Sequence, residues 1–185
     1  MKLLKNKKAL STVVTTLIIL VVSVLLATVV TFYAINVTTT RVQEESLFLT
    51  KPHVWYSTTD SRAEGALVII NTGGRDVVID KITARGQEKD WTDVYYNVTS
   101  GSISADLEYS STLADDGIIV IGGQNYTFHQ GVAGKDITLK SGQTMIVYID
   151  QPDSIALNDV GTTVGITVFS ANAQYYKEAN VQASE

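Results

Sequence analysis

Histidines and clustered carboxylates are the residues of this sequence whose types could do chemistry, and they are few. His53 and His129 are the only histidines, there are no cysteines, and neither histidine has a second ligand at metal-binding spacing. Both are therefore interpreted as strand or surface residues.

Two acidic groups could offer oxygen ligands to calcium. They are Asp115-Asp116-Gly117 and the set Glu88, Asp90 and Asp93. Neither group completes a calcium-loop pattern, so solvated turns are favoured, and we expect no metal and no cofactor.

Catalytic motifs are missing from the sequence. It contains no GxSxG, phosphate-binding loop, dinucleotide fingerprint or HExxH. Scattered acids cannot be assigned as a glycosidase pair without geometry. We therefore expect a protein that is not an enzyme.

Five aromatic residues could form a patch that contacts carbohydrate or another surface. Core packing and cross-strand pairs explain them equally well. They are Trp55, Tyr56, Trp91, Tyr95 and Tyr96.

Three N-x-S/T sequons begin at Asn36, Asn97 and Asn125. Outside the cell such asparagines are plausible acceptors of N-linked glycans. Asn36 lies near the end of a long apolar run and would be on a helix close to the membrane. Asn97 and Asn125 lie beside turn signals, so we expect them to be the better candidates.

The segment that must position everything else is the apolar run after Lys7 and Lys8, which has no charged residue before Arg41. A helix over residues 13–37 would rise about 37 Å, enough to cross a hydrocarbon core of about 30 Å. Lysines lie on its N-terminal side alone, so the positive-inside rule places Met1 in the cytoplasm. An ordinary cleaved secretory signal fits poorly, because its apolar region is shorter and ends at a small-x-small site.

Charge is divided between the two ends of the chain. Lysines 2, 5, 7 and 8 precede the apolar run, whereas the remainder carries 10 basic and 19 acidic residues. An acidic remainder argues against nucleic acid or an anionic membrane surface as its partner.

The front edge of the run, Lys7-Lys8-Ala9-Leu10, places a basic pair and one small residue directly before it. This edge resembles the class III signal peptide of archaeal type IV pilins and archaellins over roughly residues 5 to 45. The resemblance implies cleavage between Ala9 and Leu10 on the cytoplasmic side. The bacterial relatives usually carry glutamate at the fifth mature position, where this sequence has Val14, and that departure favours the archaeal branch.

Beyond residue 46 the pattern is typical of β structure. Alternating runs at 145–149 and 164–169, with turn signals every 8 to 12 residues, predict an immunoglobulin-like two-sheet sandwich. Hairpins are predicted around Thr72-Gly73-Gly74 and Gly122-Gly123, and Lys51-Pro52 is predicted to break any continuing helix. The expected class is α+β, with a signal at 1–9, a helix at 10–46 and a sandwich head at 47–185.

Together these features predict an adhesion pilin of the archaeal type IV family. The resemblance implies a helical homopolymer on the cell surface, reached through a membrane-inserted precursor, a prepilin peptidase, an assembly ATPase and a membrane platform protein. Two alternatives stay open. One is an archaellin, distinguished by whether its filament rotates, and the other is a single-pass, membrane-anchored extracellular binding module.

Overall fold

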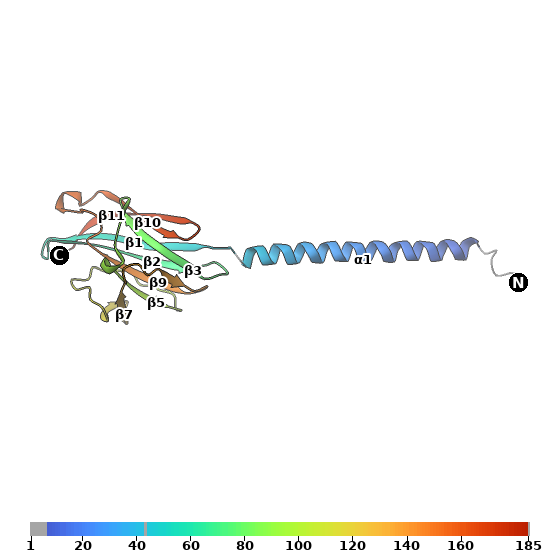
Figure 1. Cartoon of the computed structure of the whole chain (residues 1–185), viewed down its shortest axis with the longest axis horizontal. Helices are drawn as coiled ribbons and strands as arrows, with labels where there is room; N and C mark the ends of the chain where they lie inside the picture. The colour runs from blue at the N-terminus through green and yellow to red at the C-terminus, as the bar shows by residue number, and fades with distance from the viewer. Residues whose placement is uncertain (1–6, 43, 185) are drawn as a thin grey trace. The chain divides into compact units, whose positions relative to one another are not determined.

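The chain consists of a long helix and a β-sheet head, and both are drawn in Figure 1. The computed structural model describes residues 7–42 and 44–184. The chain divides into two compact units, Met1–Gln43 and Glu44–Glu185. The first unit contains α1 (Lys7–Val42), and every strand that the structure describes belongs to the second. The predicted α+β class, an N-terminal apolar helix followed by a β domain, is confirmed.

Helix α1 is 36 residues long and runs without interruption. It ends at Val42, and Glu44 to Ser46 are not helical, so the expected extension to residue 46 is wrong. Those three residues are hydrogen-bonded within the head instead. The sequence suggested a helix here because polar residues are also typical of a solvated helix end. The residues that bind this segment are far away in the chain, so the local sequence does not reveal them.

The head contains strands of two to eleven residues. In chain order they are β1 (Leu47–Ser57), β2 (Arg62–Asn71), β3 (Val77–Ala84), β4 (Gln87–Glu88), β5 (Val94–Thr99), β6 (Gly117–Ile121), β7 (Gln124–Gln130), β8 (Ile137–Leu139), β9 (Thr144–Asp150), β10 (Thr163–Ser170) and β11 (Gln174–Ser184). Two short 3-10 helices, η1 (Trp91–Asp93) and η2 (Leu157–Asp159), lie between them.

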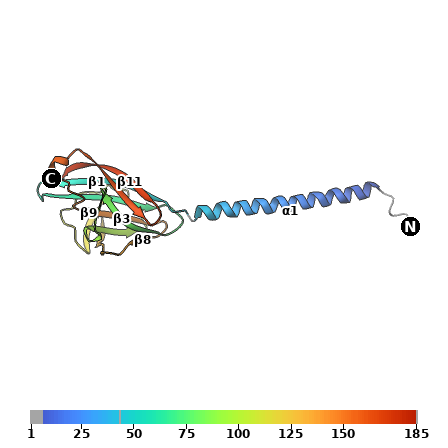
Figure 2. The same ribbon diagram turned by 45° about the horizontal axis from the view of Figure 1, so that its top comes forward.

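The strands pair in the order β4-β3-β10-β11-β1-β2-β9-β5-β7-β6, and β8 pairs with β3 outside this order. Only the β1–β11 pair is parallel among these pairings. Strand β11 joins the two halves of this order, because residues 174–180 pair with β10 and its last residues pair with β1. Figure 2 shows β1 and β11 side by side.

A first core lies between the pair β3 and β10 and the pair β2 and β9, which belong to different halves of this order. Buried side chains of β3 and β10, such as Ile82 and Ile166, belong to one cluster with Leu67 of β2 and Val147 of β9. Because strands from the two halves share a core, the arrangement favours the two-sheet sandwich that was predicted.

A second core lies on the opposite face of β1, β2, β5 and β9, where successive residues alternate between the two clusters. It includes Trp55, Ala66, Phe128 and Tyr148. Residues 100–116, which we call the strap, have no regular secondary structure and cover this face with Leu107. This sheet is therefore buried on both sides, which explains the long apolar runs of β2 and β9.

Lys51-Pro52 does not end a helix, because the structure places it inside β1. Between Thr50 and His53 the strand advances three residues while β2 advances two, from Val68 to Ala66, so one extra residue forms a β-bulge. Proline is tolerated there because the ladder is interrupted. The bulge also reverses the alternation, so that Leu47, Leu49 and Val54 all face the first core.

The two predicted hairpins have different outcomes. The hairpin around Gly122-Gly123 is confirmed, since β6 and β7 pair with Ile121 opposite Gln124, and both glycines have positive φ values of 58° and 79°. The one around Thr72-Gly73-Gly74 is wrong. Strand β2 pairs with β1 and β9, whereas β3 pairs with β10, β4 and β8.

Candidate assembly helix and head surfaces

The surface of α1 is apolar over a length that could cross a membrane. The segment Leu10–Thr39 is 30 residues long, and all of its side chains are exposed in the single chain. Several of its hydroxyl groups are hydrogen-bonded to the backbone of the helix itself. The Oγ atoms of Thr15, Ser23, Thr28 and Thr31 donate to carbonyl oxygens four residues earlier at 2.7–2.9 Å. With these donors satisfied, the helix has little need of water around it.

Small side chains create a shallow notch along one face of α1. Ala27, Thr28 and Thr31 line it together with the larger Val24, Phe32 and Ile35. Small residues in such positions allow a second helix to approach closely. This face therefore suits helix packing.

The residues expected to direct processing lie at the start of α1. Lys7, Lys8, Ala9 and Leu10 have helical backbone, while the side chains of the first three lie outside the described part of the structure. Leu10 is exposed.

The head begins with a tightly held segment at Glu44 to Ser46. The carboxylate of Glu45 is bonded by the Ser170 hydroxyl, by the Asn172 amide at 2.9 Å and by Arg75 at 3.3 Å. Burial by itself would raise the pKa of Glu45, but these bonds outweigh it and lower the pKa below its ordinary value. Thr72 and Gly73 donate their backbone N–H groups to the carbonyl of Ser46.

Replacing Gly73 with alanine should destabilise the head, because the new Cβ would lie 2.6 Å from the Glu44 carbonyl oxygen and 2.7 Å from the Ser46 nitrogen. Backbone atoms cannot move aside as a flexible side chain can. We expect a loss of about 1–3 kcal/mol in unfolding free energy, measured by denaturant titration of the detergent-solubilised protein. Gly101→Ala is the control, since its Cβ would meet only Thr99 Oγ1 at 3.7 Å. Equal stability of the two variants would contradict this account of the segment.

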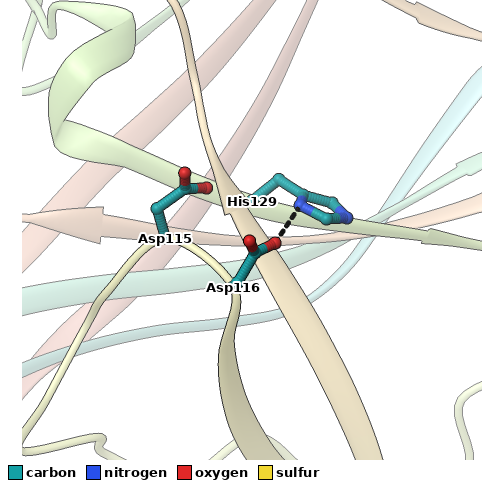
Figure 3. A group of neighbouring side chains, drawn as sticks. All are labelled: Asp115, Asp116 and His129. Atoms are coloured by element: carbon teal, nitrogen blue, oxygen red, sulfur yellow. Dashed lines mark ion pairs between the residues drawn. The ribbon is translucent and has the colours of Figure 1, made fainter.

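Asp115, Asp116 and His129 are brought together, with one potential ligand atom from each within 4.8 Å of the others (Figure 3). All three side chains are exposed. Asp116 pairs with His129 Nδ1 at 3.0 Å, and Asp115 accepts the backbone N–H of Gln130 at 2.9 Å. These contacts attach the turn at Asp115-Asp116 to β7.

The residues of the other acidic group, Glu88, Asp90 and Asp93, do not share one site, and two of them form ion pairs with different lysines. Glu88 pairs with Lys81 at 3.3 Å, and Asp93 pairs with Lys89 at 2.9 Å. The carbonyl of Asp90 accepts the N–H of Asp93 at the start of η1. Nearby lysines thus account for the charges of Glu88 and Asp93.

His53 lies in β1 directly after the bulge. Its ring stacks on Trp55 with centroids 5.0 Å apart, and Nε2 pairs with Asp106 of the strap at 2.9 Å. The hydrogen bond from His53 is the main reason why the pKa of Asp106 is lowered. Lys51 Nζ also donates to the strap, to the carbonyls of Ser104 at 2.6 Å and of Ala105. The bulge therefore directs two polar side chains onto the strap.

The five aromatic residues do not form an exposed patch. Trp55, Trp91 and Tyr95 are buried, and Tyr56 and Tyr96 are partly buried against the first core. Of the two explanations weighed from the sequence, the structure favours core and cross-strand packing.

The three sequons differ in accessibility. Asn36 is exposed on α1, and Asn125 is exposed in β7. Asn97 in β5 is half-buried, and its Nδ2 atom, to which a glycan would be attached, donates to the Thr127 carbonyl at 2.7 Å.

A buried carboxylate, Glu64, was not predicted from the sequence. It lies in β2 between Trp55 and Asp150, fully buried, and its Oε1 accepts the Ser110 N–H at 2.9 Å. Its Oε2 has no hydrogen-bond partner among the described residues. Burial raises the pKa of Glu64 to about 8. The sole signal in the sequence was an acid at the edge of an apolar run, since residues 65–70 follow it.

Similarity to known proteins was found in structure and not in sequence. No family model matches the chain, and no curated protein matches it. Among solved structures, a family 123 glycoside hydrolase from Clostridium perfringens is similar over 77% of this chain and 28% of its own, with 8% identity and a TM-score of 0.33. The ligand-binding region of serine-glutamate repeat protein A of Enterococcus faecium is similar over 77% of this chain and 98% of its own, with 12% identity and a TM-score of 0.26. Both likenesses are too low to carry an argument about function.

Proposed function

We propose that this chain is the structural subunit of an archaeal type IV adhesion pilus. The observation that carries the proposal is the surface of Leu10–Thr39, which is apolar on all sides and has hydroxyl groups bonded to its own backbone. A helix of this kind can be surrounded either by lipid or by copies of itself. A membrane-inserted precursor and a filament core each require that property.

The connection to the head supports an assembly subunit. Gln43 alone separates the last residue of α1 from the first residue of the head unit. Glu45 is then fixed by three side chains of the head. A tethered binding module would tolerate a long flexible linker, and the sequence has none between Val42 and Glu44.

Once α1 leaves the lipid, its exposed apolar surface must be covered, which is favourable by about 25 cal/mol per Å² of area buried. Neighbouring copies of α1 would supply that cover, with the notch at Ala27, Thr28 and Thr31 permitting close contact. Loss of a subunit to water would re-expose the helix and is therefore strongly unfavourable.

Maturation follows the resemblance at Lys7-Lys8-Ala9-Leu10. A prepilin peptidase would cut before Leu10 and remove the lysines, which would otherwise hold the helix at the cytoplasmic face. An assembly ATPase and a membrane platform protein would then build the filament on the cell surface.

Replacing Ala9 with phenylalanine should block this cleavage, because the side chain before the cut must be small. We expect full-length precursor to accumulate in the membrane, detected by a blot of the membrane fraction and by the mass of the N-terminal peptide. Lys8→Glu should have the same effect, and Ala9→Ser should be processed normally. Normal trimming of Ala9→Phe would contradict the proposed processing.

A further inference from the structure

The β6–β7 hairpin lies at one end of the strand order and has a free edge. Strand β6 pairs with β7 and with no other strand among those described. It contains no charged residue and no proline, and its sequence is Gly-Ile-Ile-Val-Ile. An uncharged apolar edge of this kind is a template for pairing with another chain.

The outward face of this edge is apolar. Ile118 is 62% exposed and Val120 is 56% exposed, whereas Ile121 is buried and Ile119 packs against the second core. The inward residues are accounted for by that core. Nothing among the described residues accounts for the outward pair.

Asn125 and Thr127 lie directly opposite this apolar pair. The register places Val120 opposite Asn125 and Ile118 opposite Thr127. Side chains that face each other across an antiparallel pair have Cβ atoms about 4.5–5.5 Å apart. Asn125 and Thr127 are exposed, and they are the first and third residues of the sequon Asn125-Tyr126-Thr127. A group attached to Asn125 would therefore begin beside Val120.

The other head sequon has a different geometry. Asn97 already donates Nδ2 to the carbonyl of Thr127, and its Oδ1 is buried. Glycosylation there would break a hydrogen bond and open the packing between β5 and β7. Asn125 requires neither change.

We propose that Asn125 carries an N-linked glycan whose first sugars cover Val120 and Ile118 and close the free edge of β6. The inference rests on the proposed function in one respect, since the head must be outside the cytoplasm. Nδ2 of Asn125 forms a bond to the anomeric carbon of a sugar donor linked to a polyprenyl phosphate. The bond from that carbon to the phosphate oxygen breaks, the polyprenyl phosphate leaves, and the amide proton is lost to base. No oxidation or reduction takes place.

The first experiment is glycopeptide mass spectrometry on the full chain purified from its native host. We expect glycan mass on the peptide that contains Asn125 and none on the peptide that contains Asn97. Asn125→Gln should lose that mass, while Thr127→Ser, which preserves the sequon, should retain it. An unmodified Asn125 in protein from the cell surface would overturn the proposal.

A second measurement tests the covering role. Asn125→Gln should increase binding of a hydrophobic dye and light scattering relative to the wild type, and Thr127→Ser, which preserves the sequon, should increase neither. Adding Ile118→Thr and Val120→Thr to Asn125→Gln should reverse the increase, because the exposed pair is then polar. If Asn125→Gln behaves like the glycosylated wild type, the covering role is wrong.

The two proposals fail separately. Filaments whose subunits lack the glycan would contradict this inference and leave the pilin assignment standing. Glycosylated protein that never forms filaments would contradict the pilin assignment and leave the glycan inference standing.

Discussion

Replacing Val22 with glutamate should abolish filaments while leaving a processed, membrane-inserted protein. Val22 lies near the middle of Leu10–Thr39, so in a polymer its side chain would be buried among other helices. An unpaired buried carboxylate costs several kcal/mol, and the cost recurs at every subunit. In a lone membrane span the same charge costs about 2.5–3.5 kcal/mol once per chain, which a long apolar helix can absorb.

Electron microscopy of sheared surface material and a blot of the membrane fraction are the two readouts. Val22→Leu is the matched control and should give normal filaments, because it keeps the position apolar. Filaments of ordinary length from Val22→Glu would contradict a core built from α1. A wild-type protein that stands on the surface as single copies would favour the anchored binding module.

The second large effect is on the pH dependence of the stability of the head. The pKa of Glu64 is about 8 in the folded protein, above its ordinary value of 4.5. The folded state therefore holds a proton that the unfolded chain releases between these two values. The stabilisation is complete below pH 4.5 and is lost as the pH rises to 8, with a total on the order of 5 kcal/mol.

Glu64→Gln should remove that dependence, since an amide resembles the protonated acid in shape and does not titrate. The difference in unfolding free energy between Glu64→Gln and wild type should grow in favour of the variant as the pH rises from about 5 to about 8. Denaturant titrations of the detergent-solubilised protein at several pH values measure it. Glu108→Gln, at an exposed position of the strap, is the control. Parallel curves for wild type and Glu64→Gln would show that Glu64 does not titrate in this range.

Local signals in the sequence predicted the elements that depend on local physics. The apolar run predicted α1, because length and uniform hydropathy are enough to identify such a helix. Gly122-Gly123 predicted a true hairpin, because two adjacent residues with positive φ form the tight turn that antiparallel strands need.

Features that depend on residues far away in the chain could not be predicted from the sequence. Thr72-Gly73-Gly74 resembles a hairpin turn, yet Gly73 is bonded to Ser46 and its flanking strands pair elsewhere. Lys51-Pro52 resembles a helix stop, but a bulge against β2 places it inside a strand. The burial of Glu64 and the hydrogen bond of Asn97 likewise depend on the strap and on β7, which lie far away in the chain.

The most direct test of the central claim is the N-terminal residue of the subunits in filaments sheared from the native cell surface. Mass spectrometry of the N-terminal peptide should show a chain that begins at Leu10, within material that electron microscopy identifies as filaments. That result would join the processing at Ala9 to the assembly of α1. Filaments or surface protein that retain Met1, or that begin near Asn36, would contradict the account.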